Sequence, residues 1–348
     1  MRTLMTSTSL AAVLALASAS SLAAQDAVSD PAIDAEVSAV HPATVDITEW
    51  DVEWEESRPR DPYVAPDGTI WFVGQRSHYV ATLDPATGEM ERIDLVDGAG
   101  PHTVIADENG AWYAGNRVGH IGFIDGESHE IEIIDLPGDG PNDAHTMDFD
   151  SQGNIWFTVQ GGNQIGYLDV ATREVEIWDV ETEGARPYGI LVAENDQPWV
   201  VLFGTNKLAT VENGAVREID LPREETRPRR MAITEDGQIW YVDYADGYIG
   251  RYNPDSEEID EWRTPSAGEA APYAMTSDGD GMLWFVESGP EPNLFVGFDP
   301  ATETFTEPVP VPSGGGTVRH MVFDPVANAI WFGADTNTIG RATIQSAR

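Results

Sequence analysis

Short apolar segments alternate with turn-forming residues at a regular interval along this chain. One repeat shows the pattern in full, with four segments at His145–Phe149, Ile155–Val159, Gln164–Leu168 and Glu174–Trp178. Alternating apolar and polar residues, bounded by Gly, Asp and Asn, are typical of β-strands. A tryptophan in the second segment recurs every 41 to 47 residues, and the pattern therefore predicts seven copies of one four-stranded unit. The recurring residues are Trp71, Trp112, Trp156, Trp199, Trp240, Trp284 and Trp331.

A period of this length with several strands per copy indicates a β-propeller. The last repeat stops after three segments, at Arg319–Phe323, Ile330–Phe332 and Thr338–Ala342. The segment Ile47–Trp54 has an outer-strand pattern but precedes the first complete repeat. We therefore expect an all-β, seven-bladed β-propeller in which an N-terminal strand completes the last blade and closes the ring.

The N-terminal region predicts export. Residues 1–24 combine Arg2, an apolar run from Leu10 to Leu22 and small residues at 23–24, which is the pattern of a secretory signal peptide. Residues 25–44 are expected to form an acidic, unstructured leader before a propeller domain at 45–348. We expect the mature protein to be periplasmic or secreted.

The charge of the chain excludes several classes of partner. It carries 60 Asp and Glu against 19 Lys and Arg, a formal net charge of -41, and a single lysine, Lys207. Nucleic acids and anionic membranes bind basic surfaces, so neither is an expected partner. The acidic surface favours a soluble monomer. With no cysteine, disulfides and thiolate metal sites are excluded.

In a propeller, equivalent residues of the innermost strands form a ring around a central channel. Counting back from each tryptophan, usually to the residue after a proline, predicts such a ring of polar and aromatic side chains. A ring of this kind predicts a binding site at the channel mouth. The alternative is that these side chains plug the axis and bond to their neighbours. The predicted ring consists of Tyr63, His102, His145, Tyr188, Arg230, Tyr273 and His320.

Arginines concentrate in the segments that lead into the inner strands. On so acidic a chain they predict a local positive region suited to a carboxylate, sulfate or phosphate. Alternatively they pair with nearby Asp61, Asp143, Glu224 and Glu225. These arginines are Arg58, Arg60, Arg186, Arg227, Arg229, Arg230 and Arg319.

Several repeated motifs resemble the streptogramin B lyase family, also called virginiamycin B lyases. They are Pro187–Ile190 (PYGI), Asp236–Tyr241 (DGQIWY), Asn163–Gly166 (NQIG) and Ile249–Arg251 (IGR). The resemblance covers about residues 45 to 345. It implies a seven-bladed propeller and an elimination in which a His takes the proton next to a lactone ester while carboxylate-bound Mg²⁺ stabilises the developing enolate.

The resemblance also implies roles for individual residues. His320 falls at the position of the family's base, Asp335 at that of a carboxylate that binds the metal, and Tyr63 at that of a substrate-contacting Tyr. Two positions depart from the pattern: Val318 replaces an expected Glu, and Tyr273 replaces an expected His. One Asp is a poor cage for Mg²⁺, so Arg319 could supply fixed positive charge instead. We therefore treat a Mg²⁺ cofactor as an open expectation.

Three functional hypotheses remain. The first is a C–O lyase that acts by β-elimination on a lactone or uronate-type substrate. The second is a non-catalytic propeller that binds a small anion, a peptide or a protein partner. The third, a lactonase-type hydrolase, is disfavoured because its metal cage needs Glu, Asp and Asn where this chain has Tyr, His and Arg. In the first hypothesis His320 is the base, Asp335, Tyr63 and Tyr273 complete the catalytic group, and substrate contacts come from His102, His145, Tyr188, Arg60, Arg186, Arg230 and Arg319.

Overall fold

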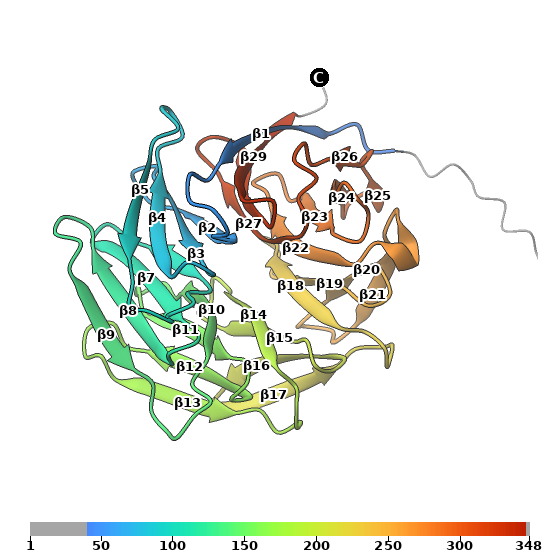
Figure 1. Ribbon diagram of the computed structural model, residues 1–348. Helices are drawn as coiled ribbons and strands as arrows, with labels where there is room; N and C mark the ends of the chain where they lie inside the picture. Colours follow the sequence, from blue (N-terminus) through green and yellow to red (C-terminus); the bar gives the residue numbers. More distant parts are fainter. Residues whose placement is uncertain (1–39, 346–348) are drawn as a thin grey trace, which may run out of the picture. The chain divides into compact units, whose positions relative to one another are not determined.

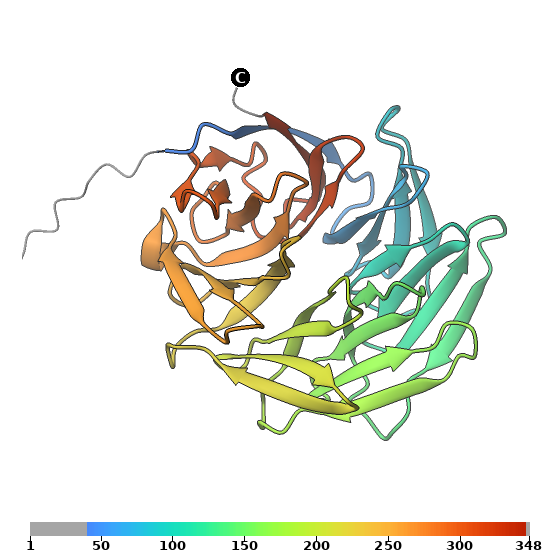
Figure 2. The same ribbon diagram turned by 180° about the vertical axis from the view of Figure 1, so that it is seen from behind.

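The computed structural model describes residues 40–345, and the predicted signal peptide and most of the predicted leader lie outside this range. Between residues 40 and 345, 29 strands form seven antiparallel sheets around a common centre (Figures 1 and 2). Each inner strand contacts the inner strands of the neighbouring sheets, and β2 contacts β27, so the sequence of contacts closes on itself. The predicted all-β, seven-bladed propeller is confirmed.

Every blade has the same order of strands from the centre outwards. The inner strands are β2 (Pro59–Val64), β6 (Val104–Ala106), β10 (Ala144–Phe149), β14 (Pro187–Val192), β18 (Pro228–Ile233), β22 (Pro272–Ser277) and β27 (Val318–Asp324). The second strands are β3 (Ile70–Gly74), β7 (Gly110–Gly115), β11 (Ile155–Val159), β15 (Pro198–Leu202), β19 (Ile239–Asp243), β23 (Leu283–Glu287) and β28 (Ala329–Ala334).

The third and fourth strands complete each sheet. The third strands are β4 (Tyr79–Leu83), β8 (His120–Asp125), β12 (Gln164–Leu168), β16 (Lys207–Glu212), β20 (Tyr248–Tyr252), β24 (Leu294–Asp299) and β29 (Thr338–Gln345). The outer strands are β5 (Met90–Asp94), β9 (Ile131–Asp135), β13 (Val175–Asp179), β17 (Ala215–Asp220), β21 (Ile259–Arg263), β25 (Thr304–Phe305) and β1 (Thr44–Asp51). A further short strand, β26 (Val309–Pro310), pairs with β24, and a 3₁₀ helix, η1 (Ala267–Glu269), precedes β22.

The recurring tryptophans all lie on the second strands and pack between blades, where most of them are almost fully buried. In three blades a tryptophan of the outer strand stacks on the recurring one. Trp50 on Trp331 is an example, with ring centroids 5.4 Å apart. Burial of so much aromatic surface supplies a large part of the apolar contact that holds neighbouring sheets together. This explains why the residue recurs with the period of the blade.

The ring closes through the N-terminal strand, as predicted. β1 pairs antiparallel with β29 over its whole length, with Ile47 opposite Ala342 (blue beside red in Figure 1). The propeller begins slightly earlier than predicted, because His41 bridges to Thr306 and Ala43 is buried in the core. Residues 41–44 of the predicted leader therefore belong to the folded unit. Within residues 40–345, no helix has the length and apolar character needed to cross a membrane.

Candidate functional site: an arginine- and tyrosine-lined channel mouth

The pairing of inner and second strands shows which residues are equivalent around the channel. In five blades a Pro or Ala at the start of the inner strand pairs with the last residue of the second strand, as Pro187 does with Leu202. Val318 occupies this place in the last blade, opposite Ala334. The next residue in each blade faces the channel mouth. These seven residues are Arg60, His102, His145, Tyr188, Arg229, Tyr273 and Arg319.

Three members of the predicted ring therefore do not lie at the channel mouth. Arg230 and His320 lie one residue further along their strands than the mouth residues of their blades. Tyr63 pairs with Trp71 and lies three residues beyond Arg60. It follows the second of two prolines in β2, whereas the register places the first, Pro59, at the equivalent position. His102, His145, Tyr188 and Tyr273 lie at the mouth position of their blades.

The channel contains two cavities that share no lining residue. The mouth cavity, of about 270 Å³, is lined by the seven mouth residues and by Arg58, Gln75, Asn116, Gln160, Arg186 and Phe203. The lower cavity, of about 260 Å³, is lined by residues further along the inner strands, including Tyr63, Met147, Arg230 and His320.

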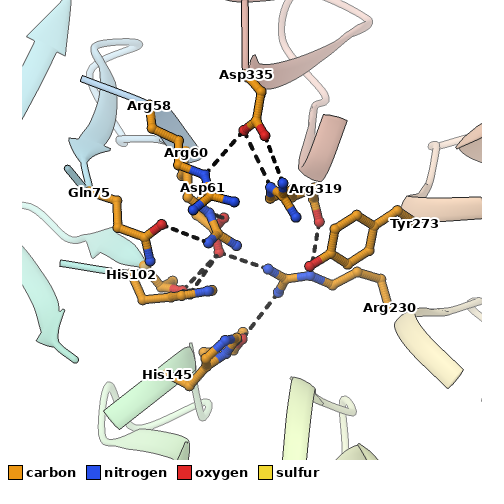
Figure 3. Close-up of polar contacts among 12 residues, drawn as sticks. Arg58, Arg60, Asp61, Gln75, His102, His145, Arg230, Tyr273, Arg319 and Asp335 are labelled. Carbon is orange, nitrogen blue, oxygen red and sulfur yellow. Dashed lines mark hydrogen bonds and ion pairs between the residues drawn. The ribbon is translucent and has the colours of Figure 1, made fainter. Parts of the chain in front are cut away.

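A layer of buried polar side chains lies between the residues of the two cavities, and Figure 3 shows the contacts of Asp61 and Arg230 within it. Asp61 accepts hydrogen bonds from Arg230 (2.9 Å) and from Thr103 (2.9 Å). Arg230 also donates to the hydroxyl of Thr146 (3.2 Å). Burial alone would raise the pKa of Asp61, but the Arg230 guanidinium above all holds it well below its usual range. Asp61 is therefore a permanent negative charge that neutralises Arg230.

Five arginines line the mouth cavity, and none of the described residues that line it is Asp or Glu. Arg58 and Arg319 contact Asp335, whereas Arg186 and Arg229 form no ion pair within residues 40–345. Two of the predicted arginines do not line the mouth. Arg230 pairs with Asp61, and Arg227 bonds to backbone oxygens of its own loop and lies 4.0 Å from Glu225. Arg60 lines the mouth but also lies 3.5 Å from Asp61. The predicted positive region therefore exists at the mouth, and the alternative of pairing with nearby acidic residues holds for Arg60, Arg227 and Arg230.

Arg229 lies on a platform of aromatic rings that sequence reasoning missed. Its guanidinium carbon is 4.2 Å from the ring centroid of Phe203, 4.1 Å from that of Tyr244 and 4.9 Å from that of Tyr273. Cation–π contacts hold a guanidinium in place without consuming all of its donors. Phe203 follows the second strand of the neighbouring blade, so only the packing of the two blades reveals this contact.

Tyr188 and Tyr273 are buried next to each other and their hydroxyl groups are hydrogen-bonded. Arg229 donates a further bond of 3.4 Å to the Tyr273 hydroxyl. Burial by itself would raise the pKa of Tyr273, but the charges of Arg60, Arg229 and Arg319, with the bond from Tyr188, lower it to about 8. Burial and the neighbouring Tyr273 raise the pKa of Tyr188. Tyr273 is therefore the member of the pair that ionises near neutral pH.

The rings of His102 and His145 lie against each other in a tilted arrangement, with ring centroids 3.4 Å apart. Each ring Nδ1 lies within 3.2 Å of the hydroxyl of the next residue, Thr103 or Thr146. Burial and the nearby arginines lower the pKa of both histidines well below the ordinary value. They are neutral imidazoles, which makes them hydrogen-bonding groups rather than cations.

The expected magnesium position does not fit a magnesium ion. Asp335 accepts a hydrogen bond of 2.7 Å from Arg319 and another of 3.3 Å from Arg58 (Figure 3). Val318, at the place of the expected Glu, is fully buried and apolar. Among residues 40–345 no cluster of three or more His, Asp or Glu side chains could hold a metal. A single carboxylate that is already paired with two guanidinium groups, with no second acidic residue beside it among the described residues, is a poor site for a hard cation that needs several oxygen ligands.

His320, the predicted base, is in the lower cavity rather than the mouth. Burial, with the charge of Arg230, lowers its pKa to about 3, and its Nδ1 is buried with no hydrogen-bond partner. Tyr63 lines the same cavity. The structure thus brings His320 and Tyr63 together, but it places both apart from Tyr273, Arg319 and Asp335.

Fold and site together define a seven-bladed propeller with a cationic channel mouth. The virginiamycin B lyase family matches residues 34–290, so the chain belongs to this family. The match includes Tyr63 and Tyr273 but ends before Val318, His320 and Asp335. No curated protein gives a significant sequence match.

Solved structures with the same fold include a streptogramin B lyase, 22% identical with a TM-score of 0.78, over 87% of this chain and 98% of that one. An inactive variant of virginiamycin B lyase from Staphylococcus aureus with quinupristin is 22% identical with a TM-score of 0.78, over 86% and 99%. Hydrazine synthase from Kuenenia stuttgartiensis is 13% identical with a TM-score of 0.69, over 85% and 97%. At these identities the likeness concerns the fold.

Proposed function

We propose that this protein is a C–O lyase that acts by β-elimination on a carboxylate-bearing substrate, of uronate type, at the mouth cavity. The observation that carries the proposal is the position of the Tyr273 hydroxyl, which is bonded to Tyr188 and Arg229 in a cavity lined by five arginines. A general base with a pKa near neutrality, beside fixed positive charge, is what abstraction of a proton next to a carboxylate requires.

The proposed step uses only side chains of this chain. Arg229 and Arg186 bind the substrate carboxylate, because neither is neutralised by an ion pair within residues 40–345. Ionised Tyr273 takes the proton from the carbon next to the carboxylate, and the C–H electron pair forms the new C=C bond. The C–O bond at the adjacent carbon breaks, its electron pair leaves with the oxygen, and solvent protonates that oxygen. The arginines stabilise the negative charge that develops on the carboxylate.

This proposal changes the roles inferred from the resemblance. His320 as the base remains a prediction, but a pKa of about 3 makes its imidazole a weak proton acceptor. Asp335 orients Arg319 through their ion pair. The proposed step does not pass through a metal.

Binding without turnover is a second candidate. It is favoured by the pairing of Asp335 with Arg58 and Arg319, which occupies the carboxylate that the family resemblance assigns to the metal. A cationic mouth with no catalytic step would still bind an anion, a peptide or an acidic partner.

A turnover assay separates the two candidates. The purified protein is incubated with uronate oligosaccharides and, for comparison, with depsipeptide lactones, and the absorbance of a new conjugated C=C bond is followed. The proposal expects turnover of the uronate substrate that is lost in Tyr273→Phe. Saturable binding of uronate by calorimetry with no new absorbance would select the binding candidate and overturn the lyase.

A further inference from the structure

The lower cavity has a wall unlike that of the mouth. The residues of the inner strands that come next after the dividing layer are mostly apolar, and four of the eight methionines of the chain lie among them. These four methionines occupy equivalent positions, because each pairs with the residue that directly follows the recurring tryptophan of its blade. They are Met147, Met231, Met275 and Met321. Methionine is flexible and polarisable, and its sulfur makes favourable contacts with aromatic rings.

One partly exposed polar group faces this apolar wall without a partner. His320 is half-buried and lines the lower cavity, and its Nδ1 makes no hydrogen bond among the described residues. A buried polar atom without a partner is costly, so a cavity beside it is a natural place for a ligand. Because its pKa is lowered to about 3, chiefly by burial, the imidazole is neutral.

The charges around the cavity argue against an ionic ligand. Arg230 donates to Asp61, Thr146 and the backbone oxygen of Arg319, so its charge and its donors are committed. Asp148 is the one acidic residue among the described residues lining the cavity, and it accepts a hydrogen bond from the Val192 N–H. Burial raises the pKa of Asp148 to about 7. The Asp148 carboxylate would disfavour an anion in this cavity, and the Arg230 guanidinium would disfavour a cation.

We propose that the lower cavity is a second binding site, separate from the mouth, for a small uncharged ligand with a flat aromatic body and one hydrogen-bonding group. Its volume of about 260 Å³ lies just below the range of roughly 300–1,000 Å³ typical of ligand pockets, which restricts the ligand to one or two rings. The aromatic body contacts the four methionines, and the polar group bonds to His320. The site does not depend on the proposed lyase activity, because the two cavities share no residue.

The test is an NMR titration of the full-length protein carrying ¹³C-methyl methionine, with indole as the probe. We expect saturable shifts of the Met147, Met231, Met275 and Met321 methyl signals. The signals of Met90 and Met282, which lie outside the cavity, should stay in place. Shifts that do not saturate, or that are equal in all six methionines, would overturn the proposal. If benzoate, an anion at pH 8, bound as tightly as indole, the claim that the ligand is uncharged would be wrong.

A pair of matched variants locates the site. Thr276 lines the cavity, and Thr276→Phe should fill it and remove the shifts. Thr304 is similarly half-buried but lies on the outer strand β25, so Thr304→Phe should bind indole as the unchanged protein does. If Thr276→Phe keeps its fold by circular dichroism and still shows the full shifts, the assignment to this cavity is wrong. The titration of the unchanged protein stays decisive if Thr276→Phe fails to fold.

Discussion

Arg230 donates a hydrogen bond of 2.9 Å to Asp61 across the channel, although the two residues are 169 positions apart in the sequence. Both side chains are buried, at 3% and 0% exposure. With Thr103 and Thr146 this pair forms the layer that divides the channel. The consequence is that the cationic mouth and the methionine-lined cavity are chemically distinct sites, and that the residues predicted to form one catalytic group fall on both sides of the layer.

The buried pair predicts a large loss of stability when it is broken. Asp61→Asn would leave Arg230 and Arg60 without a neutralising charge, which costs about 3–5 kcal/mol for buried pairs. We expect this decrease in the free energy of unfolding, measured by urea denaturation at pH 7. Because the pKa of Asp61 is lowered in the folded state, its contribution is present above about pH 4 and is lost as the pH falls below that.

Asp94→Asn is the matched control for this prediction. Asp94 is an exposed carboxylate paired with Arg92 at 2.6 Å, and exposed pairs contribute only about 0–1 kcal/mol. A similar decrease in the free energy of unfolding in both variants would show that the buried Asp61–Arg230 pair contributes no more to stability than an exposed pair.

The cationic mouth predicts that anion binding depends on particular arginines. Arg229→Glu should weaken the binding of galacturonate roughly 10- to 100-fold, because a hydrogen bond to a charged group is worth about 1.5–3 kcal/mol. Arg227→Glu is the control, since Arg227 carries the same charge two residues away but points into its own loop. Isothermal calorimetry at low ionic strength measures both. Equal losses would mean that general electrostatic attraction, rather than the mouth, binds the ligand.

The pairing of Asp335 with two arginines predicts independence from magnesium. Turnover and binding should be unchanged, within about twofold, by EDTA or by added Mg²⁺, because the one carboxylate at this position is already paired with two guanidinium groups. Asp335→Asn should reduce activity by loosening Arg319 while leaving the response to EDTA flat. Loss of turnover in EDTA, restored by Mg²⁺, would contradict this reading of the site.

The fold could be predicted from the sequence because one feature, the tryptophan, marks the same place in every blade. The strand pattern of the third blade and the closing N-terminal strand followed from the same alternation, and strand ends differed by only a few residues. The arginine cluster was also predictable, because arginines are rare on this chain and concentrate before the inner strands.

The layers of the channel could not be counted reliably from the tryptophans, because the connections between inner and second strands differ in length by up to two residues. In the second blade Ile105 pairs with Trp112, whereas in the last blade Val322 pairs with Trp331. Neighbouring residues of a strand point in different directions, so an error of one residue moves a side chain to another layer. His320 was misplaced for this reason. In the blade of Arg230 the spacing is the common one, with Ala232 opposite Trp240, and the error lay in choosing the second arginine of the Arg229–Arg230 pair. The aromatic platform under Arg229 and the methionine layer depend on contacts between blades, which a single repeat does not contain.

The dependence of turnover on pH tests the central claim most directly, because the two candidate bases differ so widely in pKa. With Tyr273 as the base, kcat/KM for a uronate substrate should rise about tenfold per pH unit up to a pKa near 8 and then level off. Tyr273→Phe should abolish this rise, and His320→Ala should keep it. A profile that is flat from pH 5 to 9, with activity that survives in Tyr273→Phe and disappears in His320→Ala, would contradict the account.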